Sequence, residues 1–141
     1  MSRLTLQQAR ALIDGALAAA REQRFKPMGV VVVDAAAQVV ASAREDGASA
    51  LRLDIALGKA AAAVGMGTNS RALAQRAKDL PAFFTSIAST AQQKFIPQTG
   101  AVLIVGGDGL VVGAAGASGG SGDEDEQIVI AGIAAAGLAH T

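Results

Sequence analysis

The stretch Gly113-Ala-Ala-Gly-Ala-Ser-Gly-Gly-Ser-Gly-Asp-Glu-Asp-Glu126 decides how this chain folds. Its first residues end a short apolar run over residues 110–114, which is typical of a strand. Its acids open residues 123–138, an Ala-rich run that is apolar nearly all round after them. Its glycines and serines predict a loop over residues 116–125. The sequence therefore predicts a strand, a glycine-rich bend and a final helix that must be covered on more than one side.

The rest of the chain consists of hairpins followed by helices. A capping box from Thr5 to Gln8 opens a first helix, which ends before Pro27. Periodicity predicts helices over residues 49–64 and 71–79, a weaker segment over 82–94, and strands over 28–33, 38–43 and 101–105. The order α-β-β-α-(α)-β-β-α predicts an α+β fold, an antiparallel sheet of about four to five strands with helices packed on it.

Length and composition limit the function classes. The 141 residues have room for one compact domain, and we expect residues 1–141 to form it. Hydrophobic residues make up 51% of the chain and charged residues 17%, which excludes an intrinsically disordered protein. The chain has no cysteine, which excludes disulfides and thiolate sites. Its single histidine, His140, is next to the last residue, so we expect neither a His-based triad nor a metal centre.

Charge is balanced overall but not along the chain. Residues 1–100 carry twelve basic and seven acidic residues, and residues 101–141 carry five acidic residues and no Lys or Arg. This asymmetry indicates complementary surfaces within one fold or between subunits, or else solvated faces and one acidic loop. With zero net charge and only 3% aromatic residues, we expect no nucleic-acid partner. No apolar run approaches the roughly 20 residues of a membrane span, and no secretory signal is visible. We therefore expect no membrane partner, and either a cytoplasmic protein or a mature domain whose leader has been removed.

The acids after the glycine-rich bend have two interpretations. In the structural one, Ser118 or Ser121 caps the final helix and the acids complement the helix dipole. In the functional one, one or two of the acids point into a pocket as a proton acceptor or as oxygen ligands for a hard cation. Four adjacent acids cannot all face one way on a helix, so at most two serve; the candidates are Asp123, Glu124 and Glu126. No Lys follows the glycines, so the stretch is not a nucleotide-binding P-loop.

Four motifs in order resemble the GlcG/HbpS family, which also includes the C-terminal domain of PduO adenosyltransferases. They are the glycine-rich stretch with Ala131-Gly132, the hairpin residues Val33-Asp34 and Val39-Val40-Ala41, the stretch Arg44-Glu45-Asp46-Gly47-Ala48, and Ala56 with Lys59-Ala60. The resemblance implies a profilin-like two-layer domain that assembles into homo-oligomers and binds heme or corrinoid, or that has no assigned activity. The candidate ligand-binding residues on these motifs are Arg44, Asp46, Lys59, Ser118, Gly119 and Gly120.

The chain departs from the family pattern around a ligand site. The usual glycine of the first turn is replaced around Ala37-Gln38, and Glu45, Ala62 and Met66 stand where the family often has Met, Thr and an aromatic residue. Heme iron normally takes an axial His, Cys, Met or Tyr. The residues that could supply one are Met1, Met28, Met66 and His140, and none is an obvious ligand, so the cofactor stays unassigned.

These observations leave three hypotheses. The first is a homo-oligomeric protein, associated through its Ala-rich helices, that binds heme, a corrinoid or a small organic metabolite. The second is an enzyme in which Arg44, Arg52 or Lys59 holds an anionic substrate while Asp46 or one of residues 123–126 moves a proton. A pocket that joins these groups, with a carboxyl group of raised pKa, favours the enzyme. The third is an accessory oligomer without a pocket.

Overall fold

The computed structural model describes residues 3–92 and 94–141, and it contains one antiparallel sheet with the strand order β2-β1-β4-β3-β5. The strands are β1 (Gly29–Asp34), β2 (Val39–Arg44), β3 (Ala101–Val105), β4 (Val111–Ser118) and β5 (Ala139–His140). The helices are α1 (Leu6–Glu22), α2 (Arg52–Met66), α3 (Ser70–Asp79), α4 (Pro81–Thr90) and α5 (Gly122–Ala135). The predicted α+β class and antiparallel sheet are therefore confirmed.

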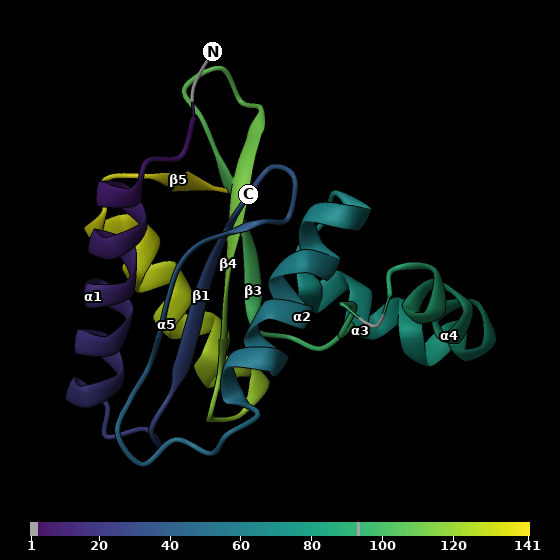
Figure 1. The fold of residues 1–141 in the computed structure, drawn as a ribbon, viewed down its shortest axis with the longest axis horizontal. Coiled ribbons are helices and arrows are strands. Elements are labelled where there is room, and N and C mark those ends of the chain that lie inside the picture. Colours follow the sequence, from purple (N-terminus) through teal and green to yellow (C-terminus); the bar gives the residue numbers. More distant parts are fainter. Residues whose placement is uncertain (1–2, 93) are drawn as a thin grey trace.

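Helices cover both faces of the sheet (Figure 1). Alternate side chains of a strand point to opposite faces, which explains the continuous apolar run of β1. Val30 and Val32 belong to the core under α1 and α5, whereas Val31 and Val33 belong to the core under α2. The sheet is thus buried on both sides at its centre.

Small residues bring the layers close together. A Cβ added to Gly116 in β4 would lie 2.5 Å from the carbonyl oxygen of Ala56, so α2 rests directly on the backbone of β4. At Gly132 in α5, an added Cβ would collide with the carbonyl oxygen of Leu12 in α1. The final helix is accordingly covered by α1 on one side and by the sheet on another, as predicted.

The predicted bend between the strand and the final helix is present, but the predicted loop bounds, residues 116–125, were too wide. Strand β4 continues to Ser118 and α5 begins at Gly122, which leaves a bend of residues 119–121. Gly116, Ala117 and Ser118 resemble loop residues in the sequence because they lack large side chains. In the structure they are buried strand residues that allow α2 to approach.

Other differences concern ends and short elements. The first helix ends at Glu22, well before Pro27, and the final helix ends at Ala135, ahead of Gly137 with its φ of 71°. The weak segment over 82–94 corresponds to α4, which begins one residue earlier, with Pro81 in its first turn, and ends at Thr90. The two-residue strand β5 was not predicted because it is too short to show a period.

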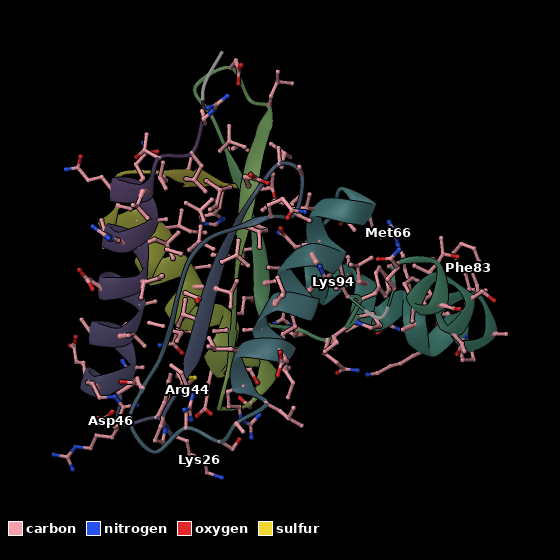
Figure 2. All side chains as sticks on the ribbon, viewed as in Figure 1. Lys26, Arg44, Asp46, Met66, Phe83 and Lys94 are labelled. Atoms are coloured by element: carbon pink, nitrogen blue, oxygen red, sulfur yellow. The ribbon has the colours of Figure 1, made fainter. Side chains whose placement is uncertain are left out.

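Helices α3 and α4 form an arm that projects from the sheet (Figure 1). A third apolar cluster of Ala62, Leu73, Phe84 and Phe95 holds the arm to the end of α2. Phe83 is 54% exposed on the outer part of the arm (Figure 2). Among the described residues, none of the helices combines the length and the hydrophobicity needed to span a lipid bilayer.

Candidate functional site

A cleft of about 440 Å³ lies at the junction of β4 and α5 and extends to the first half of α2. Gly120 and Ser121 of the bend line one part of it, and side chains of α2 line another part. The residues that line the cleft are Arg52, Ile55, Lys59, Gln98, Thr99, Ser118, Gly120, Ser121, Gly122, Asp123 and Asp125. Most of these residues are polar, so the cleft suits a polar ligand.

A buried ion pair lies at the base of the cleft. Lys59 Nζ is 2.8 Å from Asp125 Oδ2, and both side chains are nearly inaccessible, with 6% and 2% exposed. Lys59 is in the middle of α2 among buried alanines, and Asp125 is in the first turn of α5. The ammonium group also donates to the carbonyl oxygen of Ala117 at 3.0 Å. A charge in such a place is tolerated only when it is paired and hydrogen-bonded, and here both conditions are met.

The bend completes the surroundings of Asp125. The Gly120 N–H donates to Asp125 Oδ1 at 2.9 Å, so each carboxylate oxygen has a donor. Burial raises the pKa of the Asp125 carboxyl, and the contacts with Lys59 and Gly120 oppose this rise without cancelling it. A carboxyl group of raised pKa at a cleft is a feature that favours the enzyme hypothesis.

Gly100 leaves the space that the ammonium group occupies. Its φ of 139° lies in a region that residues with a Cβ rarely adopt, and an added Cβ would lie 2.8 Å from Lys59 Nζ. The turn before β3 therefore shapes the cleft from a third direction. Sequence reasoning did not single out Gly100, because a lone glycine before a strand is an ordinary turn signal.

Arg52 and Ser118 also line the cleft, and they contact each other. Arg52 is in the first turn of α2 and half-buried, and its Nη1 donates to Ser118 Oγ at 3.1 Å. Ser118 ends β4 with 1% of its surface exposed. The helix cap is Ser121, whose hydroxyl accepts from the Glu124 N–H, while the Glu124 side chain accepts from the Ser121 N–H. Ser118 is therefore free of the capping role and faces Arg52.

The other acids at the start of α5 have structural partners. Arg71 on α3 donates to both Asp123 and Glu126, and these contacts raise the pKa of its guanidinium. Asp123 lies at the rim of the cleft, whereas Glu126 does not line it. Part of the predicted charge complementarity is thus used within one chain, because Lys59 and Arg71 pair with acids of α5.

Arg44 and Asp46 lie in a separate hollow. This hollow of about 470 Å³ is lined by Arg21, Pro27, Arg44, Glu45 and Asp46, and it shares no residue with the cleft. Arg44 Nη1 donates to the carbonyl oxygen of Ala48 at 2.7 Å, and Asp46 is exposed (Figure 2). Glu45 accepts from the Met28 N–H and pairs with Arg21 at 2.9 Å, so it fixes the turn after β2.

The structure therefore divides the predicted site residues into two groups. Lys59, Ser118, Gly120 and Asp123 line the cleft. The predicted residues that do not line it are Arg44, Asp46, Gly119, Glu124 and Glu126. Gly119 is buried, and a Cβ there would collide with the carbonyl oxygen of Pro27.

Asp125 is the residue that the named acid candidates omitted. The buried positions of α5 are Asp125, Ile128, Val129, Gly132 and Ile133. These positions follow helical spacing, so the register of the apolar residues already points to Asp125 among the four acids. The same spacing in α2 places Lys59 with Ala56, Ala60 and Ala63 on the buried side.

Of the proposed axial ligands that the structure describes, Met28, Met66 and His140, none lines the cleft. Met28 is fully buried in the core, Met66 is half-buried at the end of α2, and His140 is exposed in β5. Met1 lies outside the described residues. Residues 3–92 and 94–141 contain no group of three or more His, Asp or Glu side chains that could hold a metal ion. The donors at the cleft, Arg, Lys, Ser and Asp, do not fit the axial coordination of heme iron.

Comparisons with known proteins agree on one family. Residues 4–134 match the model of a family described as "Haem degrading protein HbpS-like". The crystal structure of a PduOC:heme complex is similar, with a TM-score of 0.87 and 27% identity over 98% of each chain. A double mutant of Streptomyces reticuli HbpS is 30% identical over 95% of this chain and 87% of its own, with a TM-score of 0.81.

A more distant structure shares the fold. Klebsiella pneumoniae protein ORFY is 21% identical over 97% of this chain and 93% of its own, with a TM-score of 0.80. No curated protein sequence matches the chain significantly.

Proposed function

The chain belongs to the HbpS-like family, and on this premise we propose that it is a small-ligand-binding protein whose cleft holds a small organic anion. The observation that carries the proposal is the convergence of Arg52, Lys59 and Ser118 on one polar cleft. The heme complex of a similar protein supports ligand binding by this fold. The choice of a small anion as the ligand rests on the cleft side chains of this protein and not on the heme complex.

The charges at the cleft favour an anion. Asp125 balances Lys59, and Arg71 lies beside Asp123 outside the base of the cleft. Arg52 forms no ion pair with another described residue, so its guanidinium charge is available to a ligand. A guanidinium has five N–H donors, and the hydrogen bond to Ser118 uses one of them. The remaining donors match a carboxylate, which Arg binds through two parallel hydrogen bonds.

Lys59 and Ser118 supply further hydrogen bonds. The ammonium group has three N–H donors, and two of them have acceptors among the described residues, Asp125 and Ala117. The third donor is left for a ligand oxygen. The Ser118 hydroxyl accepts from Arg52 and can still donate its own hydrogen. An organic acid with a second oxygen function satisfies all three side chains.

We also propose that residues 1–141 form a single HbpS-like domain and that the protein is a homo-oligomer. The family match over residues 4–134 supports the first statement. The predicted interface through Ala-rich helices has little exposed surface in α2, because residues 60–63 of this helix are themselves buried. In α5, Ala134 and Ala135 are exposed and remain available. The cytoplasmic location stays a prediction from the sequence.

The experiment is a titration of the full chain with three ligand classes: small carboxylic acids, hemin and cobalamin. We expect a saturable thermal shift with a carboxylic acid. Arg52→Gln keeps the size and polarity of the side chain but removes its charge and its fork of donors. It should weaken carboxylate binding about tenfold or more. The matched control is Arg76→Gln on the exposed face of α3, which should bind as the unmodified protein does.

Three results would decide between the ligands. Saturable carboxylate binding that Arg52→Gln weakens supports the proposal. Equal binding by both proteins contradicts the assignment to this cleft. A Soret shift with micromolar hemin, without any response to carboxylates, means that the ligand is a tetrapyrrole and that the small-anion proposal is wrong.

An enzyme is the second candidate function, and the raised pKa of Asp125 favours it. A carboxyl group that keeps its proton to higher pH can donate it to a bound anion. Asp125→Asn should then abolish turnover of a bound substrate and retain a measurable part of its binding. If the unmodified protein binds the compound but does not convert it over hours, the enzyme candidate is wrong and the binding function remains.

A further inference from the structure

Strand β2 lies at an edge of the sheet and has a neighbour on one side, β1, among the described residues. The ladder to β1 shows which backbone groups of β2 are free. The Glu45 N–H donates to the Met28 carbonyl oxygen at 2.9 Å, and Ser42 stands opposite Val31. Hydrogen-bonded pairs alternate along an antiparallel ladder, so the N–H and C=O of Ser42 point away from β1. They face outward, where another strand can bind them.

A groove of about 420 Å³ runs along this edge between β2 and α1. The residues that line it are Leu6, Arg10, Ile13, Asp14, Val40, Ala41, Ser42 and Ala43. Leu6 is 47% exposed beside the groove, and Val39 is 50% exposed at the start of β2. The floor is made of small side chains, which leave room for an additional strand. The edge thus combines free backbone groups with exposed apolar surface.

Two charges in the groove indicate which strand fits. Arg10 and Asp14 are exposed on α1, four residues apart, and neither forms an ion pair with another described residue. A positive and a negative charge one helical turn apart are complementary to the same pair rotated by 180°. A two-fold axis that passes between them brings Arg10 of each copy opposite Asp14 of the other.

We propose that β2 is a self-association edge, at which two copies of this chain pair their β2 strands antiparallel around a two-fold axis. The outward N–H and C=O of Ser42 join the ladder between the copies, and the sheet continues from one copy into the other. Two reciprocal contacts between Arg10 and Asp14 flank the ladder. This inference rests on the proposed homo-oligomer and is independent of the ligand.

Charge reversal tests the pairing. Arg10→Glu and Asp14→Arg, each as a single variant of the full chain, place like charges at both reciprocal contacts. Each should weaken self-association about tenfold or more, measured by sedimentation velocity. An equimolar mixture of the two variants restores opposite charges at both contacts, so the mixture should associate as the unmodified protein does. Recovery on mixing is specific to a two-fold contact between these two residues.

The matched controls are Lys78→Glu and Asp79→Arg, the same kinds of reversal on the exposed arm. Alone or mixed, they should leave association unchanged. A second test acts on the backbone: Ser42→Pro removes the outward N–H at an edge position where proline is tolerated, and Ser42→Ala keeps it. Ser42→Pro should abolish association while circular dichroism shows a folded chain, and Ser42→Ala should associate normally.

The outcomes separate this inference from the proposals above. If the unmodified chain is a monomer at tens of micromolar, both the homo-oligomer and this edge are wrong. If it associates and none of the variants at positions 10, 14 and 42 changes that, the oligomer stands and this edge is wrong. If the purified chain carries a foreign peptide on its β2 edge in place of a second copy, the edge has a different occupant and the inference is wrong. The carboxylate titration tests the ligand independently.

Discussion

Lys59 holds an ammonium group inside the protein, and its partner Asp125 is equally buried. Removing one partner of such a pair leaves the other charge without compensation, which is more costly than removing both. Lys59→Met should therefore lower the free energy of unfolding by about 3–5 kcal/mol. The combination of Lys59→Met with Asp125→Leu should recover most of that loss. Urea denaturation of the two single variants and the double variant measures the coupling.

The control for this cycle is Arg71→Met. Arg71 is more than half exposed, and its pairs with Asp123 and Glu126 are exposed at least in part. Solvent screens such contacts, so the loss should be much smaller than for Lys59→Met. Losses of equal size at the two positions would show that burial does not set the strength of the Lys59–Asp125 pair.

Asp125 also predicts how stability depends on pH. Its pKa is raised in the folded state, so between the unfolded and folded pKa values the folded chain holds a proton that the unfolded chain has released. The contribution of Asp125 is fully present below the unfolded pKa and is lost as the pH rises through the folded pKa. Relative to Asp125→Asn, the unmodified protein should become less stable as the pH rises from about 4 toward neutrality. A difference that stays constant or grows with pH contradicts this sign.

At the scale of an element, the turn between β1 and β2 contains a strained residue. Ala37 has a φ of 61°, in the left-handed region that costs a residue with a Cβ about 1–2 kcal/mol. Ala37→Gly removes this strain and adds some unfolded-state entropy, so it should raise the free energy of unfolding by about 0.5–1 kcal/mol. Ala36→Gly in the same turn is the control, because no strain is present there to relieve, and it should be neutral or destabilising.

The elements also show what sequence patterns can predict. The β-branched run of β1 and the capping box at Thr5 have strong local signals, and both appear as predicted. The glycine-rich end of β4 has no such local signal, because its strand conformation depends on the close approach of α2 rather than on its own side chains. Ends of helices and a two-residue strand are set by tertiary contacts, and no local pattern encodes them.

At the scale of the whole molecule, the candidate site could be predicted in part. Lys59 and Ser118 carry family motifs, and both reach the cleft. Arg44 and Asp46 carry a motif too, but the path of the chain after β2 places them in another hollow. Asp125 was hidden among four consecutive acids, and only its register with Ile128 distinguishes it. Which motif residues meet depends on how the layers are joined, which a single sequence does not specify.

The ion pair at the base of the cleft joins the two layers of helices. Lys59 comes from α2 on one face of the sheet, and Asp125 comes from α5 on the other face. A ligand bound at this junction touches both layers at once, so neither layer can open without releasing it. A bound ligand should accordingly slow amide hydrogen exchange in α2 and α5 together. The two helices, which open separately without it, should then open as one cooperative unit.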